Sequence, residues 1–108
     1  MTSFDDRERA FESKFAHDAQ LRFKAEMRRN KLLGLWAAEL MGMAEDQAQA
    51  YAKEVIRSDL KEGGDEDVFR KLRGDFEQFG VDMSDHRIRK TMDEKMEEAQ
   101  RQIMAEKG

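Results

Sequence analysis

The sequence of 108 residues contains no cysteine and no proline, and it has one tryptophan and one tyrosine. Without cysteine the chain forms no disulfide and no thiolate-based metal site, which favours a cytoplasmic location. It contains no run of about 18 apolar residues, so we expect no membrane-spanning helix. The first residues, MTSFDDRERAF, carry acids where a secretory signal has an apolar stretch, so we expect no such signal.

Charge is abundant instead. Charged residues make up 41% of the chain, against about 25% in an average globular domain. Acids and bases nearly balance, because the net charge is only −4. This balance argues against nucleic acid as a partner. One short basic block interrupts the mildly acidic sequence, and it consists of Arg22, Lys24, Arg28, Arg29 and Lys31.

Glycines divide the chain into four segments with helical periodicity. Gly42, Gly63-Gly64 and Gly80 each follow such a segment, where a left-handed C-terminal cap is expected. No β-branched run or Asn-Gly turn supports a strand. The sequence therefore predicts an all-α protein, a four-helix bundle with a long first helix and antiparallel neighbours. Within a bundle domain over 20–108, the predicted helices cover about 20–41, 45–61, 65–79 and 84–106.

Residue patterns within these segments predict how the helices pack. The segment Lys31–Met41 is apolar on most sides, which places it in the middle of the bundle. Gly34 and Gly74 lie inside predicted helices, and we expect helices to pack closely there. The methionines of the last helix recur at core spacing, which favours core packing over a cofactor or partner groove. The core stripes of the third and fourth helices are Val68, Phe69, Leu72, Phe76, Phe79 and Ile88, Met92, Met96, Ala99, Ile103.

Two local features predict how the last two helices begin. Ser84 stands where an N-cap residue is expected for the fourth helix. At the start of the third helix, Glu66 with Arg70 and Asp67 with Lys71 have the spacing of favourable ion pairs one turn apart.

The N-terminal residues 1–19 form a distinct arm. Phe4, Phe11 and Phe15 lie within about 40° of one another on a helical wheel, and the rest of that wheel is charged. One interpretation is a single long helix whose phenylalanines pack on the bundle. The other is a mobile, potentially helical arm that folds into the groove of a partner. The face that carries the phenylalanines continues through three charges before the apolar part of the first helix, namely Asp18, Arg22 and Arg29.

The sequence contains no pattern typical of catalysis or of a metal site. It has no phosphate-binding glycine loop, no nucleophile motif, and only two histidines, His17 and His86. We therefore expect no enzymatic activity, no metal and no required cofactor. His17, at the edge of the arm, either tunes docking of the arm or is a solvated surface residue.

The basic block has two interpretations of its own. As a solvated helix face it needs no function. As an anion site it would hold a phosphate group or an acidic protein surface. Cations beside an aromatic ring suit a nucleotide, and the residues we select for such a site are Arg22, Lys24, Arg28, Arg29 and Trp36.

The sequence as a whole closely resembles the zeta-subunit family of alphaproteobacterial ATP synthase. The resemblance extends over essentially the whole chain. It rests on TSFDDRERAFESKFAHDAQLRFKAEMRRNKLLGLWAAELMG, AYAKEVIRSDLKEGGDEDVFRKLR and SDHRIRKTMDEKM. The sequence departs from the expected pattern at Ala44, where we would expect a serine helix cap.

The resemblance implies a four-helix bundle that inhibits ATP hydrolysis by F1-ATPase. It implies that the arm becomes helical in a catalytic α/β interface and blocks rotation of the γ subunit. The inhibitor would then be cytoplasmic and bound to the membrane-bound synthase through F1, without inserting into the membrane itself. It also implies possible binding of ADP or ATP on the bundle, as an alternative role in nucleotide sensing. The arm residues that match the family are Phe4, Asp5, Asp6, Arg7, Phe11, Lys14 and Phe15.

Overall fold

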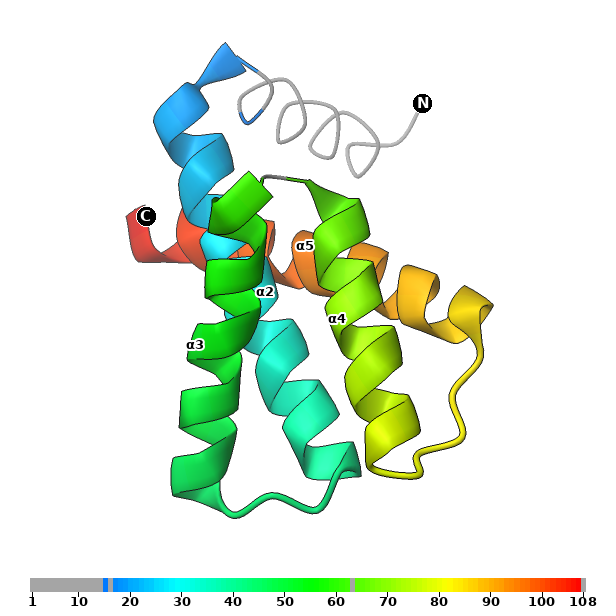
Figure 1. Cartoon of the computed structure of the whole chain (residues 1–108). Coiled ribbons are helices and arrows are strands. Elements are labelled where there is room, and N and C mark those ends of the chain that lie inside the picture. Colours follow the sequence, from blue (N-terminus) through cyan, green and yellow to red (C-terminus); the bar gives the residue numbers. More distant parts are fainter. Residues whose placement is uncertain (1–14, 16, 63, 108) are drawn as a thin grey trace, which may run out of the picture.

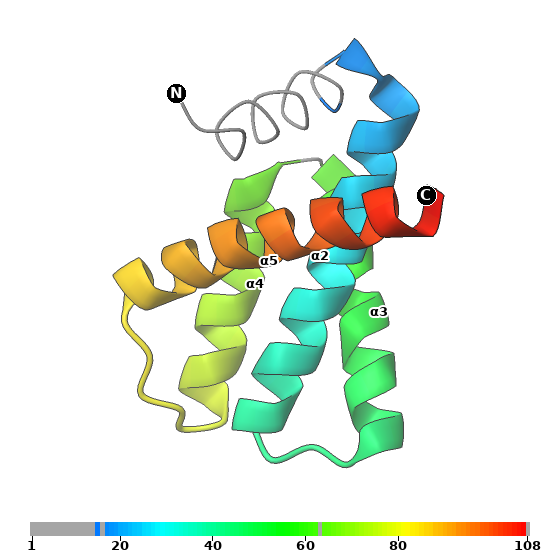
Figure 2. The same cartoon turned by 180° about the vertical axis from the view of Figure 1, so that it is seen from behind.

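The computed structural model describes residues 15, 17–62 and 64–107. These ranges contain four α-helices and no strand: α2 (Ala19–Leu40), α3 (Glu45–Glu62), α4 (Asp65–Gln78) and α5 (Asp85–Lys107). The helix α3 runs antiparallel to its neighbours α2 and α4, as expected (Figure 1). The last helix differs, because α5 crosses the other three at a steep angle instead of lying along them (Figure 2). The prediction of an all-α four-helix fold is confirmed.

The helix α2 starts at a side-chain cap. Asp18 has an extended backbone, with φ −117° and ψ 105°, and its carboxylate accepts hydrogen bonds from the N–H groups of Gln20 and Leu21. Such a cap satisfies donors that the first helical turn leaves without partners. Because Asp18 is extended, α2 does not continue as an unbroken helix into the residues before it. The predicted and observed ends of the helices differ by at most one residue.

Glycines end two of the helices. At the end of α2, Gly42 has a φ of +77°, and the N–H of Met43 donates to the carbonyl of Ala38 at 3.0 Å. This is a Schellman motif, which satisfies the last carbonyls with backbone donors. The same arrangement ends α4 at Gly80, which has a φ of +70°. The caps predicted at Gly42 and Gly80 are therefore present, whereas Gly63 lies outside the described residues and Gly64 is the N-cap residue of α4.

The predicted cap at Ser84 is also present, because its hydroxyl accepts a hydrogen bond from the N–H of Arg87 at 3.1 Å. The start of α3 has Ala44 where a serine cap is expected, and another side chain takes over part of the capping. There the side chain of Gln47 reaches back and accepts a hydrogen bond from the N–H of Ala44 at 3.2 Å. This is one half of a capping box, which stabilises a helix start that lacks a serine.

The ion pairs predicted within α4 are wrong. Arg70 pairs with Asp67 one turn earlier, and Glu66 instead reaches Arg89 of α5 at 2.7 Å. The guanidinium of Arg89 also lies 3.8 Å from the ring centre of Phe69. Lys71 pairs with Asp75 and with a carboxylate of α3. Neighbouring helices thus supply partners that sequence spacing within one helix does not reveal.

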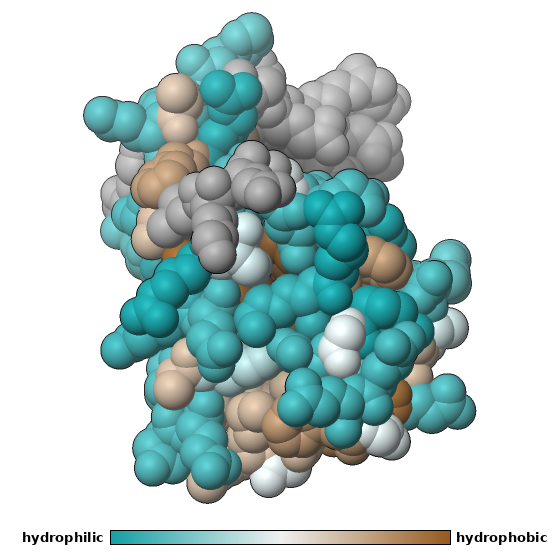
Figure 3. All heavy atoms as spheres, in the orientation of Figure 1, coloured by the Kyte–Doolittle hydropathy of each residue, from teal (hydrophilic) through white to brown (hydrophobic). Residues whose placement is uncertain are grey.

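The main core lies between all four helices, with α2 at its centre. Trp36 of α2 packs edge-to-face on Phe76 of α4, with ring centres 5.5 Å apart. Phe79 was expected on this face but is 49% exposed, because it is the C-cap residue where α4 ends. Figure 3 shows a largely hydrophilic surface with apolar side chains gathered toward its lower end. The buried members of the main core are Leu33, Ala37, Ala38, Tyr51, Val55, Val68, Leu72, Phe76, Ile88 and Met92.

The two glycines inside helices differ in their surroundings. A Cβ atom added at Gly34 would lie 2.5 Å from the Cα of Ala52, so α2 and α3 pack backbone to backbone there. The close packing expected at Gly34 is confirmed. At Gly74 a Cβ atom would meet nothing within 4 Å, so the expectation of close packing at that position is wrong.

These two positions form a matched pair of variants. We expect Gly34→Ala to lower the free energy of unfolding, since the backbone of α3 must move to admit the methyl group. We expect Gly74→Ala to raise it by up to about 1 kcal/mol, because alanine favours a helix over glycine. Urea unfolding followed by circular dichroism measures both changes. Equal effects of the two variants would contradict the close approach at Gly34.

Candidate functional site

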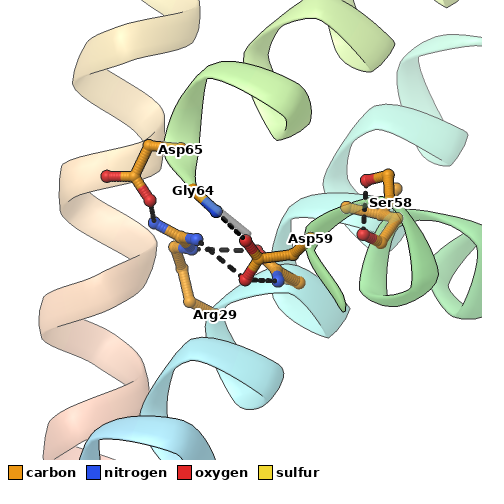
Figure 4. Close-up of polar contacts among 7 residues, drawn as sticks. Arg29, Ser58, Asp59, Gly64 and Asp65 are labelled. Atoms are coloured by element: carbon orange, nitrogen blue, oxygen red, sulfur yellow. Dashed lines mark hydrogen bonds and ion pairs between the residues drawn. The ribbon is translucent and has the colours of Figure 1, made fainter. Parts of the chain in front are cut away.

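A network of buried polar groups joins α2, α3 and α4. Arg29 is only 3% exposed, and its Nη1 donates to the Oδ1 of Asp65 at 2.8 Å. Its Nε donates to Asn30 at 2.9 Å, and Asn30 donates in turn to Asp59 at 2.9 Å. Asp59 also accepts a hydrogen bond from the N–H of Gly64, at 3.0 Å. Figure 4 shows Arg29 lying between the two carboxylates, which come from different helices.

The positive charge of Arg29 is paired with carboxylates inside the protein. The Nη2 of Arg29 lies 3.7 Å from Asp59 and makes no hydrogen bond. A buried guanidinium is stable only when it is paired, and here two carboxylates face it. Arg29 therefore connects three helices and does not present its charge to an anion in solution.

The other residues selected as a nucleotide site point to different places. Arg28 donates to Gln102 at 2.8 Å and pairs with Glu106 at 2.7 Å, both on α5. Lys24 lies 4.0 Å from the same Glu106. The hydrogen bond from Arg28 lowers the pKa of Glu106, and the pKa of Arg28 rises correspondingly. These two cations thus hold the end of α5 against α2.

The remaining two are far from each other. Arg22 is exposed near the start of α2, whereas Trp36 packs on Phe76 in the main core. Fourteen residues of helix separate Arg22 from Trp36, which corresponds to about 21 Å along the axis. The structure thus does not bring the five residues together into one binding site.

A small pocket of about 210 Å³ lies beside the polar network. Its wall includes Phe23, which is 51% exposed, and the carboxylates of Glu26 and Asp59. Two carboxylates and no cation make a poor site for a phosphate group. The other residues of the wall are Met27, Asn30, Ile56 and Gly64.

Phe15 is the one predicted arm anchor within the described residues. It is 3% exposed and lies in a second cluster, separate from the main core. We call this group the Phe15 cluster. Its members come from the start of α2 and from the middle and end of α5: Leu21, Ala25 and Ile103 are buried, and Met96 and Met104 are partly buried. The other predicted arm residues, Phe4, Asp5, Asp6, Arg7, Phe11 and Lys14, lie outside the described residues.

Both histidines are exposed to solvent. His17 is exposed just before α2, and His86 is exposed in the first turn of α5. Among the described residues, no three histidine or acidic side chains are grouped closely enough to hold a metal ion. No described helix is long and apolar enough to cross a membrane.

Comparison with known proteins identifies a family and similar solved structures. A family model described as ATPase inhibitor subunit zeta matches residues 1–102. The chain belongs to this zeta family of ATPase inhibitors. A solved structure, titled only as the solution NMR structure of a protein, is 44% identical and has a TM-score of 0.71. That match covers 80% of this chain and 98% of the other. Among curated proteins, no relative matches.

Membership in the zeta family supports an inhibitory role toward an ATPase. The description of the family is that of an inhibitor subunit, which is a regulatory role. The family match includes residues 1–14, which the structure does not describe.

Sequence reasoning missed the polar network of this zeta-family chain. Its signal was present, because Arg29 precedes Leu33 and Ala37 at intervals of four residues and so lies on the buried stripe of α2. Asp18 was likewise read as an interruption of a stripe, although an aspartate just before an apolar helix is a common N-cap. The partners Asp59 and Asp65 carry no such signal, since only the fold brings them to Arg29.

The network predicts that substitutions of Arg29 and of Asp65 lower the stability of the protein by unequal amounts. We expect Arg29→Met to lower the free energy of unfolding by about 3–5 kcal/mol, because Asp59 remains buried without its cation. We expect Asp65→Asn to cost about 1 kcal/mol or less, since that side chain is 67% exposed. Thermal unfolding by circular dichroism compares the two variants. A small effect of Arg29→Met would show that the pairing is not structurally important.

Proposed function

We propose that this chain inhibits ATP hydrolysis by F1-ATPase through its N-terminal arm. The arm inserts as a helix into a catalytic α/β interface and blocks rotation of the γ subunit. The bundle stays outside and carries the arm. In this role the protein is a cytoplasmic, non-enzymatic inhibitor, held near the membrane only through F1.

The observation that supports this proposal most directly is the break at Asp18. The backbone there is extended, and α2 begins anew with its own cap. Among the described residues, the main core uses none before Leu33. The described residues from α2 onward thus have a helix start and a core of their own, which supports a separate role for the arm.

The composition of the arm supports the same interpretation. Phe4, Phe11 and Phe15 share one face of a helix. Burying a phenylalanine contributes about 1.5–3 kcal/mol, so three of them offset much of the entropy lost when a short helix becomes ordered. The charged residues between them would face the solvent or polar groups of the partner.

The alternative proposal, an adenine-nucleotide sensor on the bundle, requires the basic block to bind phosphate. Arg28 and Arg29 are engaged in ion pairs within the protein, and Trp36 packs in the core. A nucleotide at these residues would have to displace internal partners. The arm proposal needs no such rearrangement of the bundle, and we favour it.

The decisive experiment measures ATP hydrolysis by the cognate F1 with two forms of the protein. One form is the full chain, and the other begins at Phe15, which preserves both the Phe15 cluster and the cap at Asp18. We expect inhibition by the full chain alone, with closely similar thermal unfolding of the two forms. Equal inhibition by both forms would place the inhibitory surface on the bundle.

A pair of double variants tests the anchors themselves. We expect Phe4→Ala with Phe11→Ala to weaken inhibition by about 100-fold or more, because two buried rings are lost. The matched control is Phe23→Ala with Phe79→Ala, which removes two rings exposed on the bundle. Similar loss of inhibition in both pairs would contradict the arm proposal. Phe15→Ala is unsuitable here, because Phe15 also packs in the bundle.

The nucleotide alternative has a separate measurement. Titration of the free protein with ADP or ATP, followed by NMR, would shift the signals of the basic block if that block binds phosphate. Shifts confined to those residues, together with inhibition that does not depend on the arm, would favour the sensor.

A further inference from the structure

Phe15 has two possible burial sites. In the free protein it lies in the Phe15 cluster with 3% of its surface exposed. In the proposed complex with F1 it is one of three anchors on the inserted helix. One ring cannot occupy both places, so the bundle and F1 compete for it.

The cluster that holds Phe15 is built mainly at the ends of two elements. Leu21 and Ala25 belong to the first two turns of α2, and Ile103 and Met104 belong to the last two turns of α5. None of its members belongs to the main core. Phe15 can therefore leave this cluster without disturbing the packing around Trp36 and Phe76.

The end of α5 is held to α2 by polar contacts near the surface. Glu106 pairs with Arg28 and lies within 4.0 Å of Lys24, and its side chain is 47% exposed. Exposed ion pairs contribute little stability, and the ends of terminal helices open more easily than cores. The polar contacts that close the end of α5 over the cluster are therefore weak.

Two methionines line the cluster. The side chains of Met96 and Met104 are partly buried against Phe15, Leu21, Ala25 and Ile103. Methionine is flexible and fills irregular gaps. Their packing against the cluster helps to hold Phe15 in place, so shortening them to alanine favours its release.

We propose that the Phe15 cluster is an autoinhibitory contact, in which the end of α5 sequesters the last anchor of the arm until F1 withdraws it. This inference rests on the proposed function, since it concerns the regulation of the same arm. The apparent affinity for F1 is then reduced by the fraction of molecules in which Phe15 is buried. Loosening the cluster makes the inhibitor act faster.

The test uses the full chain with Met96→Ala and Met104→Ala, and the onset of inhibition of cognate F1 is followed over time. We expect onset on the order of tenfold faster than with the wild type, because more molecules have Phe15 released. The matched control is Met92→Ala, a substitution of the same kind on the same helix but in the main core. We expect that control to leave the onset unchanged.

A second readout needs no F1. Trypsin cleaves after lysine, and cleavage of the Lys14–Phe15 bond requires Phe15 to leave its cluster. We expect faster cleavage at this bond in the Met96→Ala, Met104→Ala variant and an unchanged rate in Met92→Ala. Glu106→Gln weakens the pairing with Arg28 and Lys24 without altering the cluster, and it should accelerate both cleavage and onset more modestly. This surface variant keeps the test valid if the double variant folds poorly.

The outcomes separate the two proposals. Suppose that the wild type inhibits F1 but that neither the double methionine variant nor Glu106→Gln changes the onset of inhibition. The proposal of an autoinhibitory contact is then wrong, and the arm mechanism stands. If onset accelerates equally in Met92→Ala, general loosening of the fold explains the effect and the contact is again wrong. If the wild type does not inhibit F1 at all, the proposed function itself fails, whatever the rate of cleavage at Lys14.

Discussion

The positive charge of Arg29 is the constraint on which the arrangement of three helices depends. A buried guanidinium has to be paired, and its partners come from α3 and from the first turn of α4. Asp59 also receives the N–H of Gly64, so the same carboxylate fixes the connection between those two helices. One charge in α2 thus orders the end of the bundle from which the arm extends. The apolar core alone would not specify this end so closely, because hydrophobic contacts are not directional.

The break at Asp18 separates two tasks that a continuous helix would combine. If α2 extended unbroken through the arm, any change in the arm would alter the helix at the centre of the core. The cap at Asp18 lets α2 begin independently, while His17 and Phe15 precede it. A chain of this design can evolve its partner-binding segment and its bundle under different constraints. Phe15 is the exception, because it contributes to the packing of the bundle and also matches the pattern of the arm.

The sequence predicted the helices well because their boundaries depend on local chemistry. Gly42 and Gly80 end helices through backbone conformation, and Ser84 begins one through its hydroxyl. The sequence predicted fewer of the contacts between segments that are distant along the chain. The partners of Arg29, the pairing of Glu66 with α5 and the steep crossing of α5 depend on tertiary contacts that spacing within one helix does not contain. The selection of Arg28 and Trp36 for a nucleotide site failed to anticipate their internal contacts for the same reason.

The contact between Gly34 and Ala52 also fixes the axial register of α2 against α3. If α3 slid by one turn, either Ala48 or Ile56 would face Gly34 in place of Ala52. Isoleucine is too large for a site where a Cβ atom added at Gly34 would lie 2.5 Å from the Cα of Ala52. Alanine would fit, but the slide that brings Ala48 there would carry Asp59 about 6 Å away from Asn30 and Arg29. Steric exclusion in one direction and loss of charge pairing in the other leave a single alignment of the two helices.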